Sequence, residues 1–151
     1  MPAIKLQAIL PRLDGIAKDV VKLKKMQQIS LEDFEKDEDK FGLAQHYLRQ
    51  ALEGVFHIGS HILSRLPGGR ATEYKEIARK LGDHGIMPRD FANTTLAEMG
   101  GYRNRLTHFY AEITPQEIVE IIQNDLGDFE KFSGYIREIL KNPQKFNVTV
   151  E

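Results

Sequence analysis

Apolar residues recur at helical spacing along almost the whole chain, and this periodicity restricts its fold more than any other feature. Between positions 48 and 62 they follow one another at intervals of three or four and so share one helix face: Leu48, Ala51, Val55, Ile58 and Ile62. No stretch alternates between apolar and polar residues as a half-buried strand does. The sequence therefore predicts an all-α fold, an up-and-down helical bundle of about five helices.

Residues that start or stop helices set the expected bounds in the first half. Pro11 fits the first turn of a helix with apolar positions over 13–23, and residues 1–10 are expected to form a loose or separately helical lead-in. Ser30 begins a capping signal for a short helix or turn. A second long helix should run from about Phe41 to Leu66, because a Pro-Gly-Gly turn follows.

Similar signals divide the second half. Thr72 can cap a short helix to about Leu81, and Pro88 fits the first position of a fourth helix. Residues 114–117 read TPQE, a start signal that combines a hydroxyl cap, proline at the first position and glutamate at the third. The last helix should then stop before Asn142, with four residues turned inward: Ile118, Ile122, Phe129 and Ile136.

Length, charge, cysteine content and the lengths of apolar runs limit the classes of protein to which the chain can belong. The 151 residues suit a single domain, residues 1–151. The net charge is −1, so any polyanion has to be held by a local patch. Cysteine is absent, which excludes thiol catalysis and thiolate metal sites. No apolar run approaches the roughly 20 residues of a membrane span, so we expect a soluble, cytoplasmic protein without a membrane partner.

Residues 100–110 read GGYRNRLTHFY and concentrate polar groups that a helix does not need for its own stability. At about 100° per residue, an apolar stripe from Phe91 to Ile113 should face the core. The polar residues fall on the opposite half and are expected to meet solvent, substrate or a second chain: Arg103, Asn104, Thr107 and His108, with Tyr110 at the edge beside Arg103. A solvated helix face is the alternative for any single one of them.

This segment resembles a family signature. Arg103-Asn104-x-x-x-His108-x-Tyr110, preceded by AEMGGY, is similar to the motif of the HepT-like branch of the HEPN superfamily, which are small helical ribonuclease toxins. Residues 50–62 resemble that family's long helix, and residues 74–88 its short connecting helix. The resemblance implies a HEPN-type bundle that acts as a metal-independent endoribonuclease toxin of a toxin–antitoxin pair.

The resemblance also implies roles for three side chains. In HEPN ribonucleases the 2′-hydroxyl attacks the adjacent phosphate and leaves a cyclic phosphate. His108 would exchange a proton near neutral pH as general base or acid. Arg103 would stabilise charge on the phosphate with its planar fork, and Asn104 would orient His108 or the phosphate. This chemistry needs no metal and no cofactor.

Two partners follow from the same resemblance. A homodimer would bring two motifs to one cleft, so that a base and an acid are both at hand. A cognate nucleotidyltransferase antitoxin would silence the toxin by attaching AMP to Tyr110, since an anionic adduct beside Arg103 would block RNA. The alternative for Tyr110 is simple packing at the helix edge with its hydroxyl in solvent.

Other interpretations stay open at this point. The chain could be a non-catalytic helical binding subunit of a nucleotidyltransferase complex, or a helical scaffold without nucleotide chemistry. His46, His57 and His61 lie on one stripe of the long helix, and His57 and His61 have the spacing of a metal-binding pair. No third ligand is evident, so this stripe is read as a polar helix face or as part of an interface.

Overall fold

Seven α-helices make up most of the chain in the computed structural model, which describes residues 2–108 and 112–151. The α-helices are α1 (Leu6–Lys25), α2 (Leu31–Lys36), α3 (Glu38–Leu63), α4 (Tyr74–Asp83), α5 (Ala97–Thr107), α6 (Pro115–Asn124) and α7 (Gly127–Lys141). Shorter elements are the 3-10 turns η1 (Met26–Gln28) and η3 (Pro143–Phe146), the π-helical turn η2 (Phe91–Leu96), and the strands β1 (Ala3–Ile4) and β2 (Thr149–Val150).

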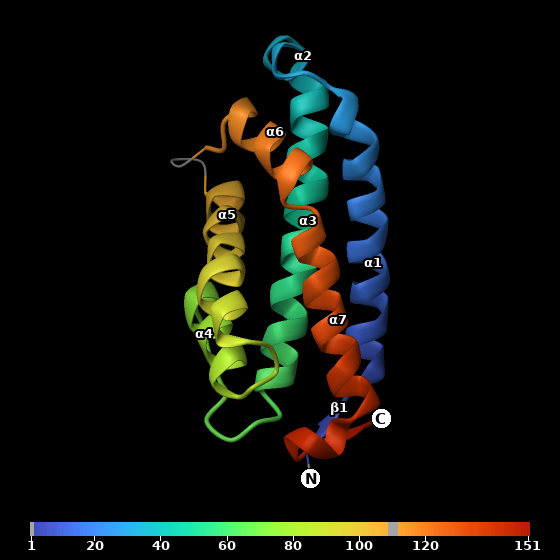
Figure 1. The fold of residues 1–151 in the computed structure, drawn as a ribbon, viewed down its shortest axis with the longest axis vertical. Coiled ribbons are helices and arrows are strands. Elements are labelled where there is room, and N and C mark those ends of the chain that lie inside the picture. Colours follow the sequence, from blue (N-terminus) through green and yellow to red (C-terminus); the bar gives the residue numbers. More distant parts are fainter. Residues whose placement is uncertain (1, 109–111) are drawn as a thin grey trace.

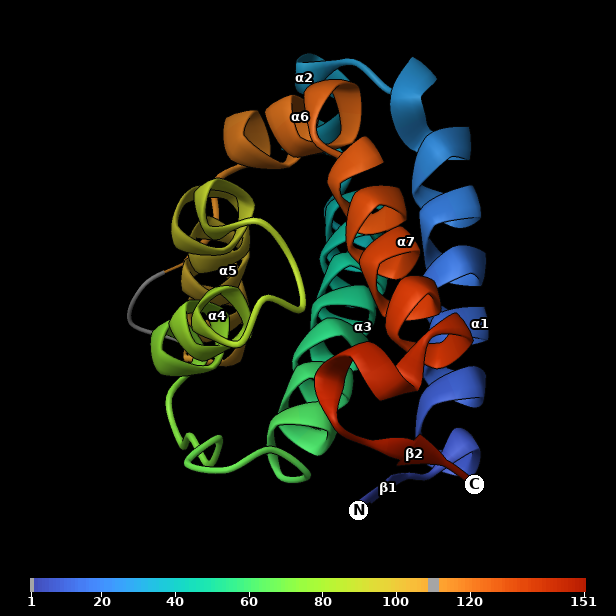
Figure 2. The ribbon, with the colours of Figure 1, turned by 60° about the horizontal axis from the view of Figure 1, so that its bottom comes forward.

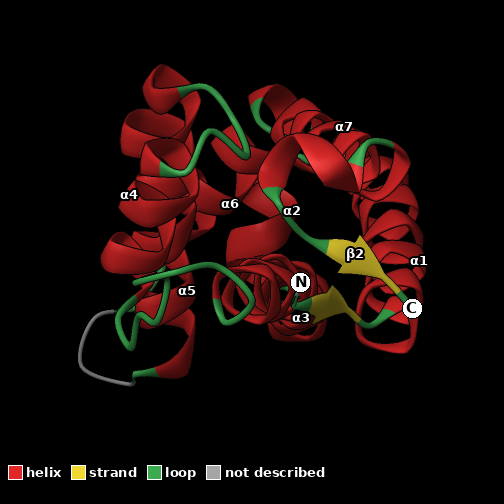
Figure 3. Cartoon of the chain, turned by 90° about the horizontal axis from the view of Figure 1, so that it is seen from below, coloured by secondary structure: helices red, strands yellow, loops and turns green. Residues whose placement is uncertain are grey.

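The helices surround one core. The two long helices α1 and α3 run antiparallel, α7 packs along both, and α5 lies on the other side of α3 with α4 beside it (Figure 1). Helix α6 crosses one end of the bundle near α2 (Figure 2). Viewed from below, α5, α3 and α1 form a row along one face, and α4 and α7 lie on the opposite side (Figure 3). The all-α prediction is confirmed.

The predicted apolar stripes form the core. All five residues of the α3 stripe between Leu48 and Ile62 are buried, and so are the four inward positions expected after Thr114. Burial of such large aliphatic and aromatic side chains is the main stabilising contribution to a domain of this size. Helical periodicity was therefore sufficient to identify the core of these segments.

Several predicted helix bounds are wrong. Helix α1 begins at Leu6, so Pro11 lies inside it, on an exposed face where the missing N–H removes one helical hydrogen bond. Helix α3 begins at Glu38, because Asp37 caps it by accepting hydrogen bonds from the N–H groups of Asp39 (3.0 Å) and Lys40 (3.2 Å). The residue at the cap of α4 is Glu73 and not Thr72, with no side-chain cap bond.

The number of helices also exceeds the prediction. The expected last helix is two helices, α6 and α7, separated at residues 125–126. A capping box starts α6 as predicted: Thr114 accepts a hydrogen bond from the N–H of Glu117, and the Glu117 carboxylate accepts one from the N–H of Thr114. Together with α2, whose cap Ser30 was predicted, this raises the count from about five to seven among the described residues.

The two ends of the described chain meet. Strands β1 and β2 pair in parallel, with Ala3 opposite Thr149 and Ile4 opposite Val150 (Figure 2). These strands were not predicted, because two-residue segments are too short to show an alternating pattern. Over residues 2–108 and 112–151, no helix combines the length and the apolar character that crossing a membrane requires.

Candidate active site

Arg103 is held by three neighbours, which we call the Arg103 clamp: Glu53, Tyr74 and Thr107. Its Nη2 lies 3.0 Å from Oε1 of Glu53 on α3, and its Nη1 donates to the hydroxyl of Thr107 at 3.2 Å. The guanidinium carbon lies 4.2 Å from the ring centre of Tyr74 on α4, a cation–π contact. Only 18% of the Arg103 side chain is exposed, because Glu53 of α3 and Tyr74 of α4 cover it.

The clamp forms because α5 approaches α4 closely at Gly100. A Cβ on Gly100 would lie 3.0 Å from Cβ of Tyr74 and 3.3 Å from Cζ of Phe56. Phe56 and Tyr74 themselves pack edge to face at 4.9 Å between ring centres, which fixes the tyrosine ring. Arg103 lies about one helical turn after Gly100 on the same side of α5, so its guanidinium packs against the ring of Tyr74.

The clamp leaves one donor of Arg103 without a partner. The Nε–H group is buried and donates to no acceptor within residues 2–108 and 112–151. Buried polar groups are nearly always satisfied, and an exception calls for an explanation. An oxygen of a bound phosphate that reached the fork of Arg103 would supply such a partner.

His108 lies at the end of α5 under different conditions. It is exposed, its backbone is extended (φ −116°, ψ 119°), and its N–H donates to the carbonyl of Asn104 at 3.1 Å. The predicted helix through Ile113 ends instead at Thr107, whose hydroxyl contacts the carbonyls of Arg103 and Asn104. Asn104 is exposed, as expected. The predictions for Tyr110 lie outside the described residues.

Arg105 ties this end of α5 to α6. Its guanidinium forms a two-pronged ion pair with the carboxylate of Glu117, including a 2.7 Å bond from Nη2 to Oε1, and Nη2 also donates to the carbonyl of Glu112 at 2.8 Å. The guanidinium lowers the pKa of Glu117 from 4.5 to about 2, and the carboxylate in turn raises the pKa of Arg105. Arg105 therefore fixes the segment that carries His108.

The histidines of α3 make separate contacts. His57 Nε2 lies 3.6 Å from Oε2 of Glu53, and His46 packs beside Tyr47. His61 Nε2 accepts a hydrogen bond from the N–H of Lys5 at 3.0 Å, and burial lowers its pKa. Across the described parts of the chain, no three His, Asp or Glu side chains are placed to hold a metal ion. Of this stripe, only His57 reaches the clamp, through Glu53.

Sequence reasoning missed two residues of this site, Glu53 and Tyr74. Both are distant from the motif in sequence; they lie in the two segments that resemble the family, residues 50–62 and 74–88, but nothing local assigned them a role. One signal was present for Glu53: it precedes His57 by one helical turn, on the polar face of α3.

Comparisons with known proteins agree with the fold and with the family that the sequence resembles. A model of the Ribonuclease HepT-like family matches residues 16–136. A curated protein of Aphanizomenon flos-aquae, "tRNA nuclease HepT", is 30% identical over 128 residues, which are 85% of this chain and 84% of that protein.

Solved structures share the fold. A tri-AMPylated HEPN toxin of Shewanella oneidensis, in complex with MNT antitoxin, matches with a TM-score of 0.76 at 21% identity, over 87% of this chain and 97% of that chain. A mutant toxin–antitoxin complex described as MntA–HpeT matches with a TM-score of 0.74 at 18% identity, over 87% of this chain and 98% of that chain.

Proposed function

The chain belongs to the Ribonuclease HepT-like family, whose activity is endoribonucleolytic, and from that premise we propose that it is the toxin of a toxin–antitoxin pair. One observation carries the proposal. The same helix, α5, presents a rigidly held arginine fork and, at its end, an exposed histidine. These are the two groups that a metal-independent cleavage of RNA requires.

The proposed reaction is an internal displacement at phosphorus. The 2′-oxygen attacks the adjacent phosphorus, the bond to the 5′-oxygen of the next nucleotide breaks, and the products are a cyclic phosphate and a 5′-hydroxyl. His108 takes the proton from the 2′-hydroxyl or gives one to the leaving 5′-oxygen. Arg103 stabilises the charge on the phosphate, and Asn104 orients His108 or the phosphate. DNA is not cut, because it lacks the 2′-hydroxyl.

We propose that the active form is a homodimer in which two motifs share one cleft. A site of this kind supplies two histidines, one as base and one as acid. The test mixes wild-type and His108→Ala subunits in varied ratios after denaturation and joint refolding. If one cleft needs both histidines, mixed dimers are inactive, and the rate of cleavage falls as the square of the wild-type fraction. A rate that falls in proportion to the wild-type fraction shows instead that each chain works with its own histidine.

The proposed partner is a nucleotidyltransferase antitoxin that attaches AMP to Tyr110. The Shewanella toxin with the same fold is AMPylated and bound to MNT antitoxin, and this supports the proposal. An AMP group attached to Tyr110 of this chain would be anionic and would compete with RNA for the positive charge of Arg103. Because the Aphanizomenon relative is named a tRNA nuclease, tRNA is the substrate class that we propose for this chain.

A second candidate function is a non-catalytic binding subunit of a nucleotidyltransferase complex. The observation in its favour is the ion pair between Arg103 and Glu53, which already engages one side of the fork. If Arg103 is catalytic, it has to bind the phosphate with the N–H groups that Glu53 does not engage, or it has to release Glu53 when the phosphate binds.

One experiment separates the two functions. Wild type, His108→Ala and Tyr110→Phe are expressed in cells, each alone and with a nucleotidyltransferase, and growth and tRNA integrity are followed. If the chain is a toxin, wild type arrests growth and cleaves tRNA, whereas cells that express His108→Ala grow normally with intact tRNA. The nucleotidyltransferase rescues cells that express wild type but not cells that express Tyr110→Phe. Equal harmlessness of wild type and His108→Ala, with intact RNA, would instead support the binding subunit.

A further inference from the structure

Helices α1 and α3 line an open groove, and its lining includes Glu53, which contacts Arg103 of α5. It has a volume of about 500 Å³. The charged side chains of its lining come from both helices: Arg12, Lys18, Asp19 and Lys22 from α1, and Arg49 and Glu53 from α3. Arg12 and Lys22 are ten residues apart, so the groove extends for about 15 Å along α1.

Glycine shapes the floor of the groove. A Cβ on Gly54 would lie 3.0 Å from Cγ1 of Ile16, so the absence of a side chain lets the two helices approach. A Cβ on Gly15, by contrast, would have no heavy atom of the described chain within 4 Å. The two glycines therefore leave the backbone uncovered in a groove whose lining also holds long basic side chains.

Positive charge dominates the groove, although the whole chain carries a net charge of only −1. Four permanent cations face two carboxylates, Asp19 and Glu53. Asp19 is only 7% exposed, and burial raises its pKa, while Glu53 is engaged by Arg103. The local patch that binding of a polyanion requires is thus present here.

The cations remain available to a ligand. Lys18 pairs with Asp14 at 3.0 Å, but both side chains are largely exposed, and such surface pairs are weak and readily exchanged. Lys22 lies over the ring of Tyr47, with its ammonium still at the surface. Arg49 is exposed as well.

Two residues connect the groove to the motif helix. Glu53 lines the groove and contacts Arg103. Arg49 lines both the groove and a second hollow of about 190 Å³ that reaches Leu106 on α5. On the other side of α5, a pocket is lined by the carboxylates of Glu98, Asp125 and Asp128, which would repel phosphate. A strand that leaves the site therefore meets favourable charge on one side only.

We propose that the α1–α3 groove binds the sugar–phosphate backbone of an RNA strand next to the phosphate held by Arg103. The inference rests on the proposed ribonuclease function and deepens it. The lining of the groove offers four cations, and its described residues include no Phe, Tyr or Trp ring on which a base could stack, so it binds backbone without reading sequence.

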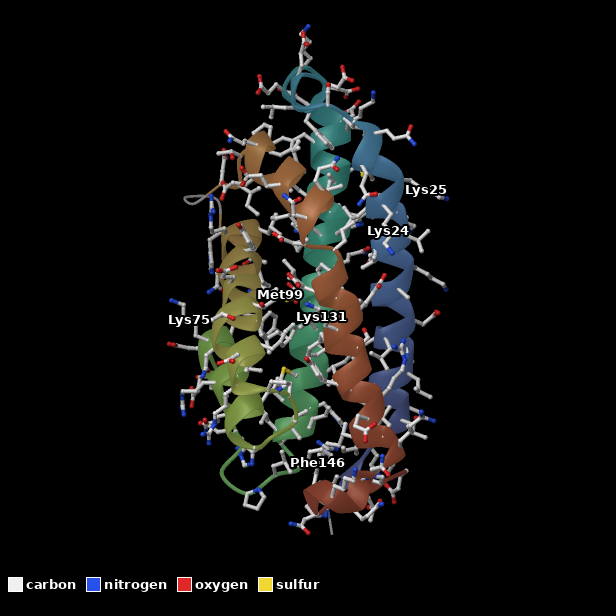
Figure 4. The ribbon with its side chains drawn as sticks, viewed as in Figure 1. Lys24, Lys25, Lys75, Met99, Lys131 and Phe146 are labelled. Atoms are coloured by element: carbon white, nitrogen blue, oxygen red, sulfur yellow. The ribbon has the colours of Figure 1, made fainter. Side chains whose placement is uncertain are left out.

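The test compares two triple variants that change net charge equally. Arg12→Gln, Lys18→Gln and Arg49→Gln neutralise the groove. Lys25→Gln, Lys75→Gln and Lys131→Gln form the control, since these exposed lysines lie on α1, α4 and α7 and do not line the groove (Figure 4). Binding of a short fluorescent single-stranded RNA is measured against salt concentration, with His108→Ala as the common background. Each lost phosphate contact lowers the slope of log K against log salt by about 0.7.

We expect the groove triple to lower this slope by about 2 and the control to leave it unchanged. In the catalytically intact background, the groove triple should raise KM with little change in kcat. Equal slopes for both triples would overturn the inference, as would a groove triple that binds RNA normally but loses a nucleotidyltransferase partner. If wild type cuts RNA but the groove triple binds RNA with the same salt slope as the control triple, the groove inference fails and the proposed ribonuclease function stands. Wild type that neither cuts nor binds RNA refutes the proposed function and the groove together.

Discussion

The two proposed catalytic residues of α5 are held in opposite ways. Arg103 is mostly buried and contacts α3 and α4, whereas His108 is exposed at the end of the helix, on a segment fixed to α6 through Arg105 and Glu117. A group that binds phosphate gains from a preorganised position, because no reorganisation is needed as charge develops. A group that transfers protons has to reach the substrate and requires access. The difference thus matches the two proposed roles.

Alanine substitutions at the two positions test this difference most strongly. Both Arg103→Ala and His108→Ala should lower the rate of RNA cleavage by about 10²–10⁴-fold. Their effects on folding should differ: His108→Ala should change the free energy of unfolding by less than about 0.5 kcal/mol, and Arg103→Ala should lower it by about 1–2 kcal/mol. Urea denaturation measures both. Equal stability of the two variants would show that the clamp contributes nothing to the fold.

The ion pair that fixes the His108 segment should make stability depend on pH. The pKa of Glu117 is lowered to about 2, so its contribution is full above about pH 4.5 and is lost as the pH falls toward 2. We expect a loss of roughly 2–3 kcal/mol over this range. Glu117→Gln keeps a side chain that suits the capping box but removes the charge, and should flatten the profile. Glu120→Gln, on the exposed face of the same helix, is the control and should leave it unchanged.

The neighbouring glycines of α5 allow a sharper test of the clamp's geometry. Gly100→Ala places a methyl group against Tyr74 and should lower the free energy of unfolding by about 1–3 kcal/mol. Gly101→Ala meets no described atom within 4 Å and should raise it by about 0.5–1 kcal/mol, since alanine favours the helix. Thermal unfolding should shift in opposite directions. A shift in the same direction would contradict the close approach of α4 and α5.

The smallest effect is expected for the clamp's carboxylate. Glu53→Gln keeps a polar group near Arg103 but removes the ion pair, and should lower the free energy of unfolding by about 1 kcal/mol, because both side chains are partly screened by solvent. Asp14→Asn breaks a fully surface pair with Lys18 and is the matched control, with a change below about 0.5 kcal/mol. Urea unfolding that gives the same value for both would place Glu53 among ordinary surface groups.

Much of the fold could be predicted from local sequence. The capping residues Ser30 and Thr114 act within three residues of the helices that they start, and the α3 stripe follows directly from helical periodicity. Predictions failed where two local signals competed. Pro11 favours a helix start, but the helix continues through it, and the break at residues 125–126 interrupts an otherwise continuous apolar pattern.

The sequence by itself determined which chemical groups α5 carries and that they lie together, because residues close in one helix are close in space. Only the tertiary structure decided their environment. Glu53 and Tyr74 reach Arg103 because α3 and α4 pack against α5, and Arg105 turns to Glu117 because α6 begins beside it. Local periodicity gives the direction of a side chain on its own helix, whereas its partner depends on which helices pack together, and this is set by the complementarity of the whole core.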